Sequence, residues 1–223
     1  EPTGLRVAHA HKGTYMRRLT FTGQAAHSAS PWLGRNAVAD AAAFVMATER
    51  ETARLAGHPH PTLGPGTLTA TIFRGGRLQN TVPAEAEVLV DRRLVPGETH
   101  QQCDLELADL LAGLADRRPG LRVSEPEVVV ATVPSETALS QPVVHAALRA
   151  VAGVGRPLPA AVGFNAGCDM SKLVGVGIPT VICGPGELAQ AHGPDEYVEI
   201  QQVLDAVDVY EAIARDLLAR GRG

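Results

Sequence analysis

The chain has 223 residues, 45% of them hydrophobic and 20% charged. These proportions are ordinary for a globular protein and exclude disordered, collagen-like and coiled-coil proteins. The 20 lysines and arginines and the 24 aspartates and glutamates give a net charge of −4. Because the basic residues are scattered along the chain, we expect no nucleic-acid partner. No apolar run approaches the roughly 18 residues of a membrane span, so we expect no membrane insertion.

The cysteines are few and isolated. Cys103, Cys168 and Cys183 are odd in number and form no Cys-x-x-Cys pair. Disulfide frameworks of secreted proteins use even sets of cysteines, whereas scattered thiols are typical of a reducing compartment. We therefore expect a cytoplasmic protein.

The spacing of apolar residues predicts the elements of the first part of the chain. Two strands come first, followed by a helix with Asn36 at its N-cap, two strands around the Gly75-Gly76 turn, a helix and a strand. Their ranges are 5–11, 15–22, 36–55, 67–73, 84–94, 99–115 and 122–130. Without the first strand the order is βαββαβ, which predicts a ferredoxin-like sheet with two helices on one face. We assign this domain to residues 14–131.

After Pro134 helices and strands alternate, as in α/β proteins. The expected helices span 141–152, 170–174 and 200–219, and the expected strands span 160–164 and 179–183. Both strands are short and continuously apolar, as in strands that are covered on both faces, so we expect them to belong to a larger sheet. Residues 1–13 and 132–223 are assigned to one discontinuous α/β domain, only part of which lies in this sequence.

His192 is the histidine with the strongest indication of a role. It lies in a loop that follows the predicted strand 179–183, and α/β proteins gather their active sites at the carboxyl ends of such strands. Asp195 and Glu196 follow closely. They could orient the second ring nitrogen of a metal-bound imidazole, or they could instead stabilise the amino end of the last helix.

Three other groups of residues are candidates. His27 lies among small residues, which leave its imidazole room to project, and its neighbour Ser28 does not indicate a serine hydrolase because no Gly-x-Ser-x-Gly motif occurs. His9 and His11 share one face of a strand and could chelate a metal, although hydrogen bonding is the commoner use of such histidines. Arg92 and Arg93, near a strand end, could bind a substrate carboxylate or could be solvated. No glycine-rich phosphate loop occurs, so a nucleotide cofactor is not expected.

Seven short motifs follow one another along almost the whole chain: Glu1-Pro2-Thr3, His11-Lys12-Gly13, Gly23-Gln24-Ala25-Ala26-His27-Ser28, Gly34-Arg35-Asn36-Ala37, Asn80-Thr81-Val82-Pro83-Ala84-Glu85, Arg93 and Ala191-His192-Gly193-Pro194-Asp195-Glu196-Tyr197. In order and spacing they resemble the family of dinuclear zinc hydrolases that includes acetylornithine deacetylase, succinyl-diaminopimelate desuccinylase and glutamate carboxypeptidase. The resemblance implies a zinc-peptidase-like α/β domain interrupted by a βαββαβ lid, through which the protein forms a homodimer.

The resemblance also implies metal ligands. Glu1 corresponds to a terminal ligand of one zinc ion and His192 to a ligand of the other, and cobalt is an alternative metal. The family's His-x-Asp motif, bridging aspartate and Glu-Glu pair lie upstream of the position of Glu1, and nothing in these 223 residues replaces them. A centre with two ions about 3.5–4 Å apart needs a shared carboxylate. We therefore expect that the natural polypeptide continues upstream and that this chain alone is inactive.

Further site residues follow from the same resemblance. His27 corresponds to a lid histidine that reaches the partner's active site and helps to hold the carbonyl oxygen as it becomes an oxyanion. Asn80 and Arg93 correspond to residues that bind the carboxylate end of the substrate. Gly167 and Cys168 resemble part of a Gly-Thr-Asp substrate loop in which cysteine replaces threonine, so contacts through Cys168 differ from those of the family.

The expected function is metal-dependent hydrolysis of an N-acyl or peptide bond in a small substrate, an N-acyl amino acid or a dipeptide with a free carboxylate. The type expected is that of acetylornithine deacetylase or succinyl-diaminopimelate desuccinylase. The alternative is a catalytically incomplete fragment that serves only for dimerisation and substrate binding. The two hypotheses differ in the amount of zinc that the chain should bind.

Overall fold

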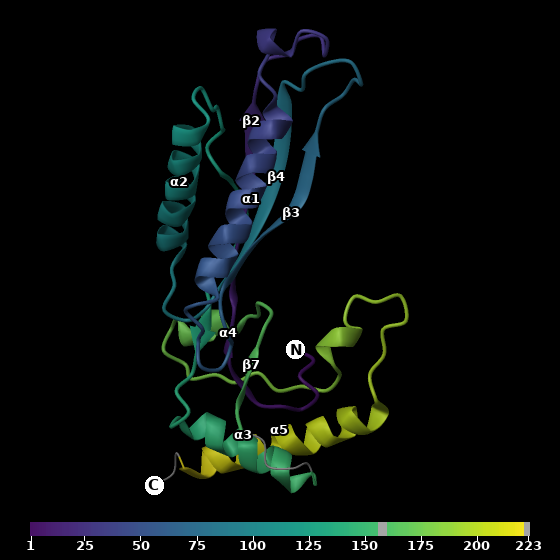
Figure 1. Cartoon of the computed structure of the whole chain (residues 1–223). Helices are drawn as coiled ribbons and strands as arrows, with labels where there is room; N and C mark the ends of the chain where they lie inside the picture. The colour runs from purple at the N-terminus through teal and green to yellow at the C-terminus, as the bar shows by residue number, and fades with distance from the viewer. Residues whose placement is uncertain (156–159, 221–223) are drawn as a thin grey trace. The chain divides into compact units, whose positions relative to one another are not determined.

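The computed structural model describes residues 1–155 and 160–220 (Figure 1). The chain forms two compact units: unit 1 comprises Glu1–Lys12, Pro61–Leu63 and Pro134–Gly223, and unit 2 comprises Gly13–His60 and Gly64–Val133. Each unit combines helices with strands, so the predicted α/β class is confirmed. Unit 2 is thus inserted into the chain of unit 1.

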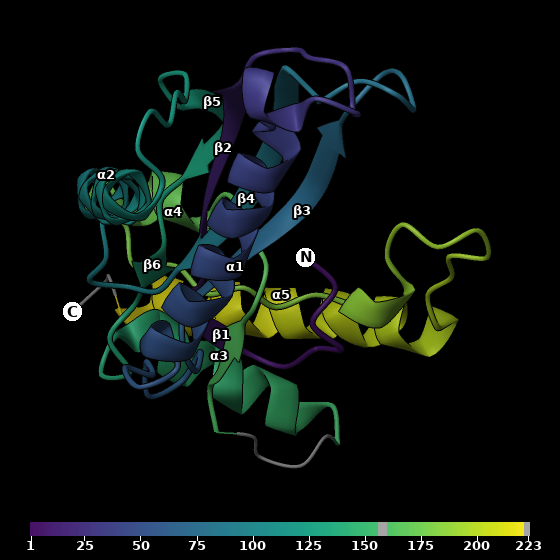
Figure 2. The same cartoon turned by 45° about the horizontal axis from the view of Figure 1, so that its top comes forward.

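Unit 2 has the predicted βαββαβ order. Its elements are β2 (Gly13–Thr22), η1 (Pro31–Leu33), α1 (Ala37–Leu55), β3 (Thr67–Gly75), β4 (Glu85–Leu94), α2 (His100–Arg117) and β5 (Glu127–Thr132). The strands form one antiparallel sheet in the order β3-β4-β2-β5. Figure 2 shows α1 lying across the strands. Strands β2 and β5 pair from Thr14 with Thr132 onward, so the chain enters and leaves unit 2 through adjacent strands.

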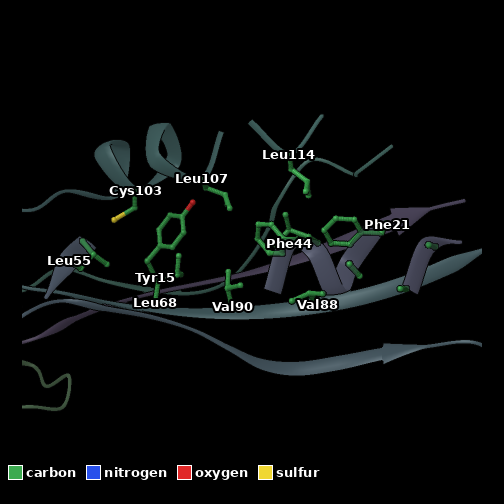
Figure 3. Close-up of a cluster of buried hydrophobic side chains, with 14 of the residues drawn as sticks. Tyr15, Phe21, Phe44, Leu55, Leu68, Val88, Val90, Cys103, Leu107 and Leu114 are labelled. Atoms are coloured by element: carbon green, nitrogen blue, oxygen red, sulfur yellow. The ribbon is translucent and has the colours of Figure 1, made fainter. Parts of the chain in front are cut away.

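Strand β4 shows why the sheet has one buried face. Every second residue from Ala86 to Leu94 is buried, and the residues between them are exposed or half-buried. Side chains from α1, α2 and the strands meet on this face, where the rings of Phe21 and Phe44 lie 5.5 Å apart (Figure 3). Because strand side chains alternate between faces, the other residues of β4 are left on the face opposite to the helices. These residues are Glu85, Glu87, Leu89, Asp91 and Arg93.

Two predictions about the ends of elements have clear outcomes. The amide nitrogen of Ala39 donates to the side chain of Asn36, so the predicted N-cap of α1 is confirmed. The last strand of unit 2 was expected over 122–130, but β5 spans Glu127–Thr132. In the predicted first half of that strand, Val123 makes only an isolated bridge to Phe21.

Unit 1 contains a three-stranded sheet in the order β6-β1-β7. Its elements are β1 (Ala8–His11), β6 (Ser135–Glu136), α3 (Pro142–Gly153), β7 (Val162–Phe164), α4 (Met170–Val174), η2 (Leu188–Gln190) and α5 (Ile200–Arg220). Val7 packs in a cluster with residues of α3 and α5, which lie against each other (Figure 1). The next residue, Ala8, packs with Phe164 and Met170 in a second cluster. Since consecutive strand residues face opposite sides, the start of β1 is covered on both faces.

The prediction of a strand over 179–183 is wrong. Only Ile182 pairs, through an isolated antiparallel bridge with Ala8. The hydroxyl of Thr137 accepts from the backbone nitrogen of Thr180 and donates to its carbonyl oxygen, so a side chain occupies the backbone groups that a neighbouring strand would use. The apolar run reflects burial of Ile182 in the core rather than a strand.

No helix in the described ranges has both the length and the apolar character that crossing a membrane requires.

Asp40 of α1 connects two distant segments of unit 2. Its side chain is 2% exposed, and its two oxygens accept from Arg35 Nε at 2.7 Å and from Arg118 Nε at 2.6 Å. Arg35 also donates to the carbonyl of Pro119. The segment that leads from His27 into α1 is therefore tied to the end of α2.

We expect Asp40→Ala to lower the free energy of unfolding of unit 2 by about 2 kcal/mol, because two charge-assisted hydrogen bonds to a buried carboxylate are lost. Glu127→Ala is the control, since Glu127 is 63% exposed and pairs with Arg18 at the surface; its effect should stay below about 1 kcal/mol. Urea unfolding of both variants measures the difference. Equal losses of unfolding free energy in the two variants would show that the hydrogen bonds of Asp40 stabilise the unit no more than an exposed ion pair does.

Candidate functional site

Glu1 and the loop that carries His192 line one pocket of unit 1. The pocket has a volume of about 490 Å³. Its lining includes Glu1, Pro2, Gly184, Pro185, Gly186, Glu187, Gln190, Ala191, Glu196, Tyr197, Val198 and Tyr210. Ala191 is the neighbour of His192. Glu1 and His192, which are 191 positions apart in the sequence, therefore lie in the same region of the unit.

Thr3 fastens the first residues to this pocket. Its side chain is buried, and its hydroxyl donates to the carbonyl of Arg6 at 2.7 Å and accepts from the amide of Gly184 at 3.1 Å. The amides of Thr3 and Leu5 both donate to the carbonyl of Gly184. A Cβ atom at Gly184 would lie 2.6 Å from the carbonyl oxygen of Glu1. Glycine is therefore required here for the two backbones to approach.

His192 has an unusual backbone conformation. Its φ angle is +63°, in the left-handed region where histidine is more frequent than most residues and where strain gathers at functional sites. The amide nitrogen of His192 donates to Glu196 Oε2 at 2.8 Å. The sequence left open whether Glu196 orients the imidazole or stabilises the last helix. In the structure Glu196 holds the backbone of the loop, and the ring of His192 is exposed.

Carboxylate and imidazole are donors that zinc accepts, so Glu1 and His192 fit a zinc site in kind. They do not complete one. Within residues 1–155 and 160–220, no group of three or more His, Cys, Asp or Glu side chains could hold a metal ion. The described part of the chain therefore contains no complete set of metal donors.

His9 and His11 do not chelate a metal together. Both ring nitrogens of His9 are engaged, Nδ1 with the carbonyl of Thr137 at 3.0 Å and Nε2 with the hydroxyl of Thr62 at 3.2 Å. His11 Nδ1 bonds to the carbonyl of Lys12 at 3.0 Å. Among the described residues His11 Nε2 is buried without a hydrogen-bond partner. Burial lowers the pKa of His11, and the Lys12 carbonyl and the charge of Glu1 act in the opposite direction.

Cys168 lies near the same first residue. Its thiol is half-buried beside the cluster of Ala8 and Phe164. Burial raises the pKa of Cys168, an amide hydrogen bond from Met170 lowers it, and the negative charge of Glu1 adds to the rise. Glu1 is thus close enough to influence both Cys168 and His11. Sequence reasoning assigned no role to His11 apart from chelation, and its buried, unpartnered nitrogen is visible only in the structure.

In unit 2, backbone pairing places His27 beside Asn80. His27 forms an antiparallel bridge with Thr81, and the amide of Ser28 donates to the carbonyl of Asn80 at 2.9 Å. Both His27 and Asn80 are exposed. The amide nitrogen of Ala29 donates to His27 Nδ1 at 3.1 Å, so in the neutral imidazole the proton resides on Nε2. His27 therefore presents an N–H donor to its surroundings.

The structure separates two arginines that the sequence treats alike. Arg92 lies on the buried face of β4, where it donates to the carbonyl of Arg93 and to Glu98 Oε1 at 2.5 Å. Arg93 lies on the other face, with 32% of its side chain exposed. Its guanidinium donates to Asp91 Oδ2 at 2.8 Å and to the hydroxyl of Thr14 at 3.1 Å. Arg93 is accessible to a ligand, whereas Arg92 is a structural residue.

Comparison with known proteins gives a consistent result. Residues 9–119 match the family model described as the peptidase dimerisation domain. Over 210 residues, 89% of this chain, the sequence is 33% identical to an acetylornithine deacetylase of Klebsiella pneumoniae, of which the match covers 51%. The chain thus spans about half the length of this curated relative.

Solved structures of low sequence identity share the fold. Aminopeptidase PepT from Bacillus cereus has a TM-score of 0.76 at 20% identity, over 98% of this chain and 56% of that one. The M20 family metallo-carboxypeptidase Sso-CP2 from Sulfolobus solfataricus has a TM-score of 0.73 at 19% identity, over 96% of this chain and 61% of that one. These structures show the fold alone. The match to the peptidase dimerisation domain and the 33% identity to an acetylornithine deacetylase assign the chain to the family of peptidases and deacetylases that its ordered motifs resemble.

Proposed function

We propose that the complete protein hydrolyses an N-acyl or peptide bond next to a free carboxylate in a small amino-acid-like substrate, with the help of metal ions. The observation that carries this proposal is the meeting of Glu1 and the His192 loop at one pocket of unit 1. The relative named acetylornithine deacetylase supports N-acyl amino acids as substrates. A succinyl-diaminopimelate desuccinylase type of substrate or a dipeptide is included in the proposal.

In this proposal Glu1 and His192 each bind one of two zinc ions, with cobalt as an alternative. Zinc in such a centre polarises the substrate carbonyl and lowers the pKa of a bound water. Because the described residues contain no group of three metal donors, the remaining ligands would have to come from outside these 223 residues. Gly184 and Thr3 serve the site by holding Glu1 against the loop that ends at His192.

His27 is proposed to stabilise the developing oxyanion. Its Nε2 carries a proton when Nδ1 accepts from the Ala29 amide, and a positioned N–H donor is what a carbonyl oxygen needs as it gains charge. Arg93 would fork the substrate carboxylate, because a guanidinium offers parallel donors to the two oxygens. Asn80 is held beside His27 by backbone pairing, at the opposite end of β4 from Arg93, so in this proposal it would bind the carboxylate end of the substrate in the partner's site, as His27 would act there. Gly167 and Cys168 would line the path by which the substrate enters the site.

We also propose that the protein is a cytoplasmic homodimer joined through unit 2. The match of residues 9–119 to a peptidase dimerisation domain supports the dimer. Its sheet has two edge strands, β3 and β5, which are natural places for a partner. Cys103, Cys168 and Cys183 remain thiols, in keeping with a reducing compartment.

We expect the complete protein to hydrolyse at least one of N-acetylornithine, succinyl-diaminopimelate and simple N-acyl amino acids. Removal of metal with a chelator should abolish turnover, and zinc or cobalt should restore it, because the reaction depends on the metal for the nucleophile. Steady-state kinetics measures both steps. Absence of metal-dependent turnover on every substrate would count against the proposed function.

We expect the 223-residue chain, purified alone, to bind far less zinc than the complete protein, because a stable site needs about four ligands. Elemental analysis after extensive dialysis gives the metal content, and sedimentation of the same sample should show a dimer. Two tightly bound zinc ions in the isolated chain would contradict the proposal that the remaining ligands come from outside it.

We expect His27→Ala to lower kcat by about 10²- to 10³-fold with little change in KM, as for loss of one oxyanion donor. His58→Ala is a matched control, since His58 lies in a loop of the same unit and is exposed. A mixture of His27→Ala and Glu1→Ala subunits should regain activity, because each mixed dimer has one site with an intact Glu1 and the partner's His27. Random pairing gives about a quarter of the wild-type activity. No recovery would indicate that His27 acts within its own subunit.

A further inference from the structure

Asp91 and Arg93 form a pair on the open face of the unit 2 sheet. They are two residues apart on β4, so their side chains point to the same side, opposite to α1 and α2. Asp91 Oδ2 accepts from Arg93 Nη2 at 2.8 Å. Arg93 Nη1 donates to the hydroxyl of Thr14 at 3.1 Å, and Thr14 lies opposite Arg93 on the neighbouring strand β2. The guanidinium is therefore held at two of its nitrogens.

We propose that Asp91 is a positioning residue, which sets the orientation of Arg93 for a substrate carboxylate. This inference rests on the proposed function, in which Arg93 binds that carboxylate. Asp91 does not touch the substrate in this arrangement. It acts through Arg93 alone.

The burial of the pair distinguishes it from an ordinary surface ion pair. The side chain of Asp91 is only 13% exposed, whereas that of Arg93 is 32% exposed. Exposed pairs contribute little because both side chains remain mobile and screened by water. Here the anchor is mostly buried and the arginine retains an accessible part. The more buried Asp91 can therefore hold the guanidinium in place, while the more exposed Arg93 can contact a ligand.

The hydrogen bonding of Asp91 supports the same inference. Within the described part of the chain, its side chain has a hydrogen bond to Arg93, and its other oxygen, Oδ1, is buried without a partner. Leaving a buried acceptor unpaired is unfavourable. Stabilisation of the sheet therefore does not account for a carboxylate at this position. Its hydrogen bonding is directed to the guanidinium of Arg93.

Orientation matters because an arginine side chain has several rotatable bonds. Ordering it during binding costs conformational entropy, and a side chain that is ordered beforehand avoids this cost. Bidentate recognition also requires the guanidinium plane to match the plane of the carboxylate. Asp91 and Thr14 fix two nitrogens from two strands, so the plane is set before the substrate arrives.

The test compares one substrate in two forms. The N-acyl amino acid that the complete protein cleaves fastest is assayed as the free acid and as its α-carboxamide. Asp91→Ala should raise KM for the free acid about tenfold, as expected for loss of preorganisation, with kcat within about twofold. KM for the carboxamide should not change, because it does not use the arginine fork. Asp91→Asn, which keeps an acceptor oxygen, should restore KM for the free acid to within about threefold.

Two further variants make the test specific. Thr14→Val removes the second tether without removing a charge, so it should also raise KM for the free acid alone, and it decides the matter if Asp91→Ala does not fold. Glu87→Ala is the control. Glu87 lies on the same face of β4 and pairs with Arg18 at 3.4 Å, and its loss should leave both substrates unchanged.

The outcomes separate this inference from the proposed function. If Asp91→Ala and Thr14→Val affect both substrate forms equally, or neither form, Asp91 is a structural residue and the inference is wrong. If the wild-type protein itself does not distinguish acid from carboxamide, the proposed role of Arg93 fails and the inference fails with it. Selective loss of affinity for the free acid in both variants supports it.

Discussion

The structure of unit 2 depends on the burial of one face of strand β4. Ala86, Val88, Val90 and Leu94 have almost no exposed surface and pack beneath α1 and α2. Fully burying a valine or leucine side chain contributes roughly 1.5–3 kcal/mol. This sets the register of the strand, because a slip by one residue would move every side chain to the wrong face. The packing of the apolar residues therefore places Glu85, Glu87, Asp91 and Arg93 on the open face and leaves Arg92 on the buried one.

This constraint gives the neighbouring arginines different roles. Arg92 shares the buried face and finds carbonyl and carboxylate partners there, whereas Arg93 emerges among Asp91 and Thr14 on the other face. The same packing supports the segment that carries His27. Asp40 projects from the buried side of α1 and holds Arg35 and Arg118, so the segment that leads to His27 is attached to the helical layer by charge-assisted hydrogen bonds.

In unit 1, hydrogen bonds to the backbone hold the first residues in place. The hydroxyl of Thr3 and the absence of a side chain at Gly184 allow the first residues to lie against segment 184–186. Glu1 and residues on both sides of His192, Ala191 and Glu196 among them, then line one pocket. The proposed function assigns this pocket to part of a catalytic centre, and it assigns substrate contacts to His27 and Arg93 of the inserted unit.

Periodicity and motifs in the sequence alone determined the βαββαβ order, the Asn36 cap and the family, because these depend on local spacing along the chain. The alternation of residues along a strand and the capping residue before a helix can be recognised in the sequence itself. The partners of those residues depend on contacts between distant segments. Only the tertiary structure showed that Thr137 replaces a strand at Thr180, that both nitrogens of His9 are engaged, and that Glu196 holds a backbone. It also decided which arginine is accessible, since the two faces of β4 differ only in what packs against them.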